Sequence, residues 1–410
     1  MMKCGRWLLW FAGVSLSVMA GLSSSAQAQT GLRVIDSPSP EYVFADRPPA
    51  FTLKAESDAV ITEATLFVRT PDEPNTFVGK AIFEQGRTIT ASYTLDPGRR
   101  RIAAFSPVEF WWELHDRAGR QLTTDHQTFT YVDNRFEWQA ESDGPITVHW
   151  YEGNQGYVQA ALDIARRTLA EGNRDLRAPE PERVDIYLYA TAGAVRAAIT
   201  AANHMWIDSQ ASPQINVIIA ALPPEAPDVR AQIERKLPHE LTHMLVYTLA
   251  GDRMTSLPTW LNEGLAMANQ FSAEPDFAQL LASARGTNSL LPLAALCGPF
   301  PAEQAQARLA YAQSESVVRF IREKLGSEKL HALILAYADG LDCSAGAQRA
   351  LNLSLAELED RWLTEAFAPA ASANARATWW PWIVLGVLVV LAPLGFLLLA
   401  RPRKARTQVI

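Results

Sequence analysis

Residues 237–244 read LPHELTHM, and within them His239, Glu240 and His243 form the pattern His-Glu-x-x-His. In an α-helix, side chains four positions apart lie on the same face, so the two imidazoles can point at one metal ion. Zinc takes imidazole and carboxylate ligands, and a catalytic zinc site keeps one position open for water. This stretch therefore predicts a helix that supplies two metal ligands. The alternative is two histidines that are satisfied within an apolar core.

A second motif supplies a third ligand. Residues 260–266 read WLNEGLA, and we predict that Glu263 in this segment binds zinc together with His239 and His243. Glu240 cannot share that coordination geometry, but it can reach the water at the open position and act as a general base. A bound metal would lower the pKa of this water and polarise a carbonyl group, which makes hydrolysis feasible at neutral pH. Since the chain has 7 histidines in 410 residues, coincidence is a poor explanation of two such motifs.

Together the two motifs resemble those of the gluzincin metallopeptidases, especially the compact bacterial peptidase MA-like domains. The resemblance is specific over residues 237–266, and it implies a zincin-like fold, a zinc cofactor and hydrolysis of peptide bonds. The chain lacks the Gly-x-Met-Glu-Asn segment with which aminopeptidases hold a free amine. It also lacks a carboxylate one turn after Glu263, where Met267 stands, so another group must orient a ligand imidazole.

The resemblance also points to Tyr311, which lies in a predicted helix over residues 305–325. Related domains carry a tyrosine near the metal at this position. This implies that the phenol of Tyr311 donates a hydrogen bond to the oxyanion that forms during catalysis. A core tyrosine at helical spacing is the alternative.

Pro238 immediately precedes the first histidine. Proline is favoured at the first position of a helix, and inside a helix it removes one hydrogen bond. Either the metal-binding helix begins at Pro238, or a helix over residues 229–237 bends there. Both arrangements keep His239 and His243 one turn apart.

Two kinds of structure are expected on either side of residue 138. Residues 29–138 contain short apolar runs separated by Pro, Gly, Asp and Asn, which predicts an immunoglobulin-like or fibronectin-like β-sandwich. From residue 139 strands and helices alternate, and after the second motif the pattern is helical. We therefore predict an α+β protein in which residues 139–367 form the zincin-like peptidase domain, a sheet followed by helices.

The individual elements follow from periodicity and turn signals. The strands expected in the sandwich are 51–55, 61–70, 77–83, 88–95, 108–114 and 121–132. In the peptidase domain we expect strands 146–150, 184–189 and 215–221, and helices 157–169, 194–200, 277–284, 305–325, 328–338 and 355–366. Ser354 and Glu357 predict a capping box for the last helix. Strand 215–221 is expected to be the sheet edge that pairs with an extended peptide, and an inner strand is the alternative.

Both ends of the chain carry targeting signals. Residues 1–28 have a charged start, an apolar stretch and an Ala-Gln-Ala site, which predicts a cleaved signal peptide; an uncleaved anchor is the alternative. Residues 379–400 predict a transmembrane helix, because they are apolar, begin with tryptophans and precede a basic tail, 401–410. A buried core helix is the alternative. Since basic residues mark the cytoplasmic side, we expect residues 29–378, including a linker over 368–378, to lie outside the cytoplasm.

Cys297 and Cys343 remain once the signal peptide is removed. An even pair in an oxidising compartment predicts a disulfide, and the alternative is two free buried thiols.

These features predict a membrane-anchored, extracytoplasmic zinc metallopeptidase that acts on a peptide or protein substrate. One alternative is a non-catalytic binding or assembly module built on a peptidase fold, with a protein partner held by the β-sandwich. Another is a processing factor that acts on a single partner. The net charge of −7 argues against a nucleic-acid partner.

Overall fold

The computed structural model describes residues 31–71, 73–199 and 208–367, together with 382–385, 387 and 389. The predicted signal peptide, linker and basic tail lie outside the described residues, as does most of the predicted span 379–400. No helix in the described part of the chain combines the length and the apolar character that crossing a bilayer requires.

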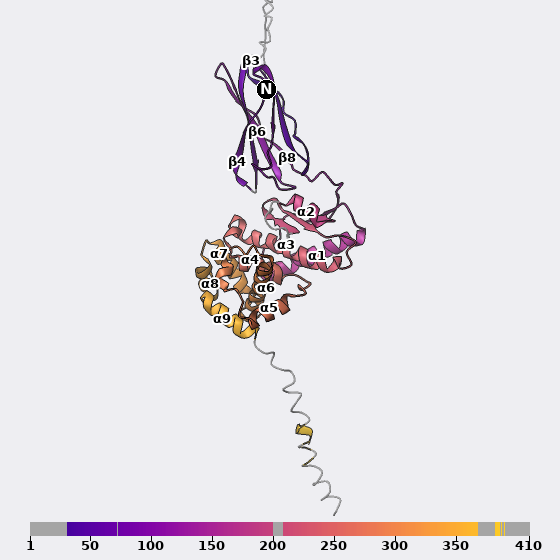
Figure 1. Ribbon diagram of the computed structural model, residues 1–410, viewed down its shortest axis with the longest axis vertical. Helices are drawn as coiled ribbons and strands as arrows, with labels where there is room; N and C mark the ends of the chain where they lie inside the picture. The colour runs from indigo at the N-terminus through magenta and orange to yellow at the C-terminus, as the bar shows by residue number, and fades with distance from the viewer. Residues whose placement is uncertain are drawn as a thin grey trace, which may run out of the picture.

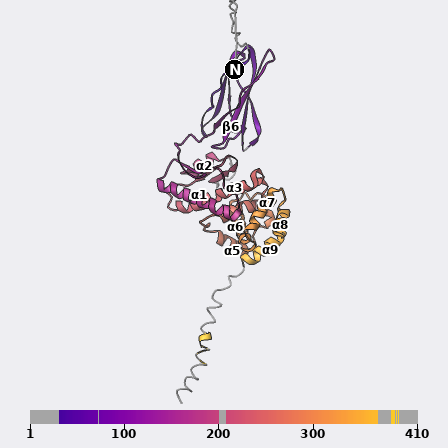
Figure 2. The same cartoon turned by 180° about the vertical axis from the view of Figure 1, so that it is seen from behind.

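The described chain has a β domain at one end and a helical part at the other, with α9 farthest from the β domain (Figures 1 and 2). Strands β1 to β8 pair among themselves, and β9 to β13 form a second sheet. The strands of the β domain are β1 (Arg33–Asp36), β2 (Glu41–Val43), β3 (Arg47–Thr70), β4 (Glu73–Lys80), β5 (Gly86–Thr94), β6 (Pro107–Asp116), β7 (Gln121–Thr123) and β8 (Gln127–Thr130).

The long strand β3 organises the β domain. Its first half pairs with β1, β2 and β5, and its second half pairs with β4 and β6. The two halves enclose one core, in which the ring of Phe51 lies 5.1 Å from that of Phe110 on β6. The sequence predicted two separate strands here, 51–55 and 61–70. The chain does not turn between them: β3 runs unbroken from Arg47 to Thr70, and within it the hydroxyl of Ser57 donates to Asp116 on β6 (2.9 Å).

The second sheet has the order β12-β13-β11-β10-β9. Its inner strands are parallel and both edge strands are antiparallel to their neighbours. The strands are β9 (Gln139–Asp143), β10 (Ile146–Trp150), β11 (Val184–Tyr189), β12 (Ser209–Ser212) and β13 (Val217–Ala221). The predicted strands 146–150 and 184–189 are confirmed.

The prediction that residues 215–221 form the sheet edge is wrong. β13 lies between β12 and β11, and the edge next to it is β12, a strand that the sequence analysis missed. All five residues of β13 are buried, because both faces of the sheet are covered. A continuous apolar run is typical of such an inner strand.

Helices lie on both faces of this sheet, and those from residue 229 onward follow it in the chain. The bounds are α1 (Gln155–Leu176), α2 (Ala192–Ala198), α3 (Val229–Ala250), α4 (Thr259–Ala268), α5 (Phe277–Gly286), α6 (Gln304–Phe320), α7 (Ser327–Ala338), α8 (Cys343–Leu351) and α9 (Leu355–Ala366). α6 continues as a π-helical turn, η4 (Ile321–Leu325), and α9 starts with the predicted Ser354–Glu357 capping box. The predicted disulfide joins Cys297 in η3 (Leu293–Cys297) to Cys343.

The two faces of the second sheet belong to different cores. Ile218 and Ala220 of β13 point into a core shared with α1 and α3, whereas Val217 and Ile219 point into the core of the β domain and α2. At this second face, the ring of Phe105 from the β domain stacks on that of Tyr187 of β11, with centroids 3.4 Å apart. The sheet is therefore enclosed between the β domain and the helices.

Gly264 permits α4 to lie close against α6. A Cβ atom at this position would be 2.5 Å from the backbone oxygen of Ser314 in α6, an atom that cannot turn aside as a side chain can. We expect Gly264→Ala to lower the free energy of unfolding by about 2–3 kcal/mol, as overpacked cores do, measured by urea denaturation. Gly286→Ala is the matched control, since a Cβ atom there meets nothing within 4 Å. Equal stability of the two variants would contradict the close packing.

Candidate metal centre

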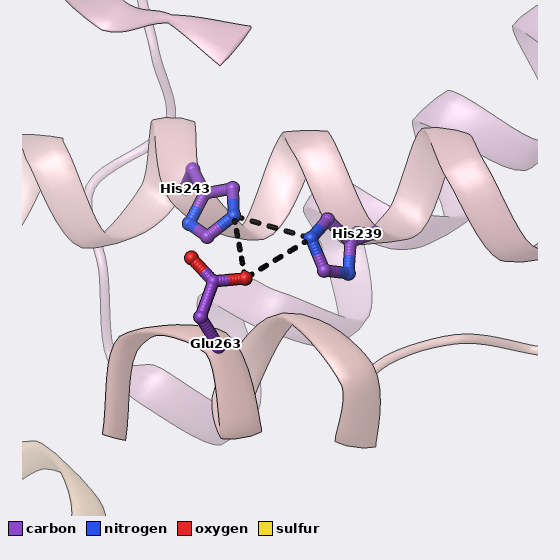
Figure 3. A group of neighbouring side chains, drawn as sticks. All are labelled: His239, His243 and Glu263. Carbon is purple, nitrogen blue, oxygen red and sulfur yellow. Dashed lines mark hydrogen bonds and ion pairs between the residues drawn. The ribbon is translucent and has the colours of Figure 1, made fainter. Parts of the chain in front are cut away.

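Helix α3 carries the two histidines of the His-Glu-x-x-His pattern. It runs from Val229 to Ala250 through Pro238, so the metal-binding helix does not begin at the proline. The side chain of Thr242 donates to the carbonyl oxygen of Pro238 (2.7 Å) in the same turn. His239 and His243 extend from one face of this helix, as Figure 3 shows.

Helix α4 brings Glu263 to the same point. Trp260, Leu261 and Leu265 are fully buried and fix α4 in the core, which leaves Glu263 free to face α3. Figure 3 shows the carboxylate extending from α4 toward the two imidazoles on the neighbouring helix.

The three side chains converge with spacings that suit one zinc ion. The Nε2 atoms of His239 and His243 are 3.3 Å apart, and Oε2 of Glu263 lies 3.6 Å from the first and 3.9 Å from the second. Two ligands at about 2.0–2.1 Å from a tetrahedral zinc ion lie roughly 3.3 Å from each other. Two imidazoles and one carboxylate are also a donor set that catalytic zinc sites use. The residues therefore fit Zn²⁺, and they were predicted from the sequence.

The charges of these three groups support one another. Burial by itself would raise the pKa of Glu263, but His243 and His239 hold that pKa below its ordinary value. Burial by itself would lower the pKa of His239, yet the bond to Glu263 and the charges of Glu240, Glu263 and Glu274 raise it. A cation is thus favoured at this point, and a zinc ion competes with a proton for His239.

Asn262 orients the imidazole of His243. Its side-chain oxygen lies 3.2 Å from Nδ1 of His243, so the ring donates Nδ1–H to the amide and presents Nε2 to the metal. This amide takes the place of the missing carboxylate at Met267. Asn262 belongs to the WLNEGLA motif, but nothing in the motif indicated this role.

Glu240 lies beside the three ligands and is 4 % exposed. Its Oε1 accepts a hydrogen bond from the hydroxyl of Ser209 at 2.7 Å. Ser209 is the first residue of β12, the edge strand that the sequence analysis missed. The structure thus brings the predicted base, the predicted ligands and a residue from the sheet edge together.

Tyr311 of α6 lines the same cleft as the ligands and Glu240. Burial, and then the charges of Glu263 and Glu240, raise the pKa of its phenol, so the group stays protonated and can donate a hydrogen bond. Its ring contacts that of Phe300 edge-on, with centroids 5.0 Å apart. The location of Tyr311 is therefore compatible with the predicted role of this residue near the metal.

The family model of the Peptidase MA superfamily matches residues 164–368, which is half of the chain. The chain belongs to the peptidase MA superfamily. Similar solved structures include an M1 zinc metallopeptidase from Deinococcus radiodurans, at 13% identity and a TM-score of 0.35, covering 83% of this chain and 95% of that one. A mutant of the Deinococcus enzyme bound to a Tyr-Ser-Ala substrate is similar at 13% identity and a TM-score of 0.35, covering 83% and 96%. No protein with curated annotation matches.

In this member of the superfamily, the metal site opens into a cleft of about 720 Å³. The edge strand β12 forms one wall with Ser209, Gln210 and Ala211, and residues of α5 and α6 form another. The floor is the face of α3 that carries the two histidines. The cleft is large enough for several residues of an extended peptide next to the metal site.

Proposed function

We propose that this protein is a zinc-dependent metallopeptidase of the gluzincin type that hydrolyses peptide bonds in a peptide or protein substrate. The observation that carries the proposal is the convergence of His239, His243 and Glu263 beside a buried carboxylate, Glu240, at the floor of an open cleft. The superfamily membership supports it independently.

The zinc ion, held by the two histidines and Glu263, would polarise the scissile carbonyl and make the attacking water more acidic. Glu240 accepts a proton from this water and passes it to the leaving amine. The phenol of Tyr311 donates a hydrogen bond to the carbonyl oxygen as negative charge develops there. Asn262 keeps His243 in the tautomer that leaves Nε2 without a proton.

The edge of β12 that pairs with no strand among the described residues is the proposed place for the substrate backbone. β12 pairs with β13 on one side, and it lines the cleft next to the metal site. An extended peptide can add to such an edge through backbone hydrogen bonds, which hold its scissile bond over the metal.

We further propose that the enzyme is anchored in a membrane and faces away from the cytoplasm. The apolar stretches at residues 1–28 and 379–400, and the basic tail 401–410, support this arrangement. The disulfide between Cys297 and Cys343 is typical of an oxidising compartment. Residues 29–138 would form an immunoglobulin-like or fibronectin-like module that is available to a protein partner, and 139–367 the peptidase domain.

A survey of peptide cleavage tests the proposal. Purified full-length protein in detergent is incubated with a mixed peptide library, before and after removal of zinc with a chelator, and products are identified by mass spectrometry. We expect cleavage that is lost with zinc and restored when zinc is returned. A zinc-loaded protein that cleaves no peptide or protein would contradict the proposal and favour a binding or assembly module.

A further inference from the structure

The start of the edge strand β12 is attached to helix α3 through its first residue, Ser209, and through Asp208 just before it. Nζ of Lys236 on α3 donates to Oδ2 of Asp208 (2.8 Å) and to the carbonyl oxygen of Ala221 (2.7 Å). The next residue, Ser209, donates its hydroxyl to Oε1 of Glu240 (2.7 Å). Since Lys236 and Glu240 are four positions apart, they lie on one face of α3, and this face holds the start of the strand.

Ser209 is the contact that decides where the carboxylate of Glu240 points. Glu240 is buried, and the bond from Ser209 is the side-chain hydrogen bond that it makes among the described residues. A carboxylate with one such bond has one oxygen held in position, and its second oxygen can accept another hydrogen bond or a proton. With Oε1 held by Ser209, Oε2 remains available to the cleft.

We infer that Ser209 is a positioning residue for the proposed general base, an inference that rests on the proposed function. A hydroxyl is an uncharged donor, so it can hold Oε1 both when Glu240 is ionised and when Oε2 carries the proton taken from water. A misplacement of a reacting group by about 1 Å can lower a rate by about 100-fold. The edge strand therefore has two tasks: its backbone receives the substrate, and its first side chain aims the base.

We expect the strand to stay in place when the hydroxyl is removed. β12 pairs with β13 in register from Ser209 opposite Ala220 to Ser212 opposite Val217, and Lys236 holds Asp208 independently of Ser209. Ser209→Ala therefore removes the bond to Glu240 and leaves the wall of the cleft intact. Ser209→Thr keeps the hydroxyl. Ser212→Ala is a matched control, because Ser212 lies on the same strand and its hydroxyl accepts from Gln210 (3.3 Å), whereas the donor to Glu240 is Ser209.

The first test separates kcat from KM in the full-length zinc protein with a peptide from the library. We expect Ser209→Ala to lower kcat about 10-fold, less than complete loss of a general base would, while KM changes less than twofold. Ser209→Thr should recover most of the rate, and Ser212→Ala should match the wild type. An unchanged kcat for Ser209→Ala, or no recovery with threonine, overturns the inference.

The second test does not depend on hydrolysis. Acetohydroxamate is a zinc-binding inhibitor whose N–OH group would donate a hydrogen bond to the carboxylate of Glu240. Its Kd therefore depends on the position of that carboxylate. We expect Ser209→Ala to raise this Kd about threefold or more in the wild-type background and to leave it unchanged in Glu240→Gln, as coupled neighbours do. Equal effects in both backgrounds overturn the inference. If the wild-type protein cleaves nothing, the proposed function fails, and this cycle still decides the role of Ser209.

Discussion

Replacing Glu240 with glutamine is expected to lower kcat for peptide hydrolysis by about 100- to 10,000-fold, the usual contribution of a general base. The change keeps the shape of the side chain and its bond from Ser209, but an amide cannot accept a proton from the attacking water. Because Glu240 is not one of the three converging ligands, zinc should stay bound. The measurement combines steady-state kinetics with the zinc content of the same protein sample.

The matched control for this prediction is Glu234→Gln. Glu234 lies on the same helix, but it pairs with Arg230 on the surface and does not line the cleft. We expect wild-type kinetics for this control. A Glu240→Gln protein that keeps its zinc and its kcat would show that another group takes the proton.

Replacing Glu263 with glutamine is expected to have the largest effect on the metal. The carboxylate of Glu263 lies within 3.9 Å of Nε2 of both histidines and supplies the negative charge of the ligand set. Loss of a partner that merely orients a ligand lowers metal affinity by about 10- to 100-fold, so loss of a ligand should cost more. We expect the zinc Kd, measured by competition with a chromogenic chelator, to rise by more than about 100-fold, and hydrolysis to fall with it.

Glu274→Gln is the control that removes a negative charge from the cleft without removing a proposed zinc ligand. Glu274 lines the same cleft and its charge also acts on His239, but it does not belong to the converging group. We expect this variant to bind zinc with nearly wild-type affinity. If both variants lost zinc equally, general electrostatics of the cleft would hold the metal, and Glu263 would not be a specific ligand.

The metal centre could be predicted from the sequence because its signal is local. His239 and His243 are one helical turn apart in any helix, independent of the tertiary structure. Glu263 lies in WLNEGLA, a motif that is recognisable by its sequence alone. The inner strands β10 and β11 were also readable. In β10, buried Ile146, Val148 and Trp150 alternate with partly exposed residues, whereas nearly all of β11 is buried.

The edge of the sheet could not be predicted, for a physical reason. β12 reads Ser-Gln-Ala-Ser, which has no apolar alternation, because its stability comes from pairing with β13 and from the contact with Lys236. The roles of Ser209 and Asn262 were missed on the same ground. Ser209 acts on Glu240 and Asn262 acts on His243, and only the fold brings each pair together. A single serine or asparagine forms no recognisable sequence pattern.

The sheet enclosed between two cores has a consequence for how the molecule unfolds. Neighbouring residues of β13 enter opposite cores, Ile218 on the side of the metal-binding helix and Ile219 on the side of the β domain. Detaching the β domain would expose Val217, Ile219 and Tyr189 to water on the strands that support the cleft. The β domain is thus a structural support of the part that carries the metal site, and we expect the two to lose their native packing together, as one cooperative unit.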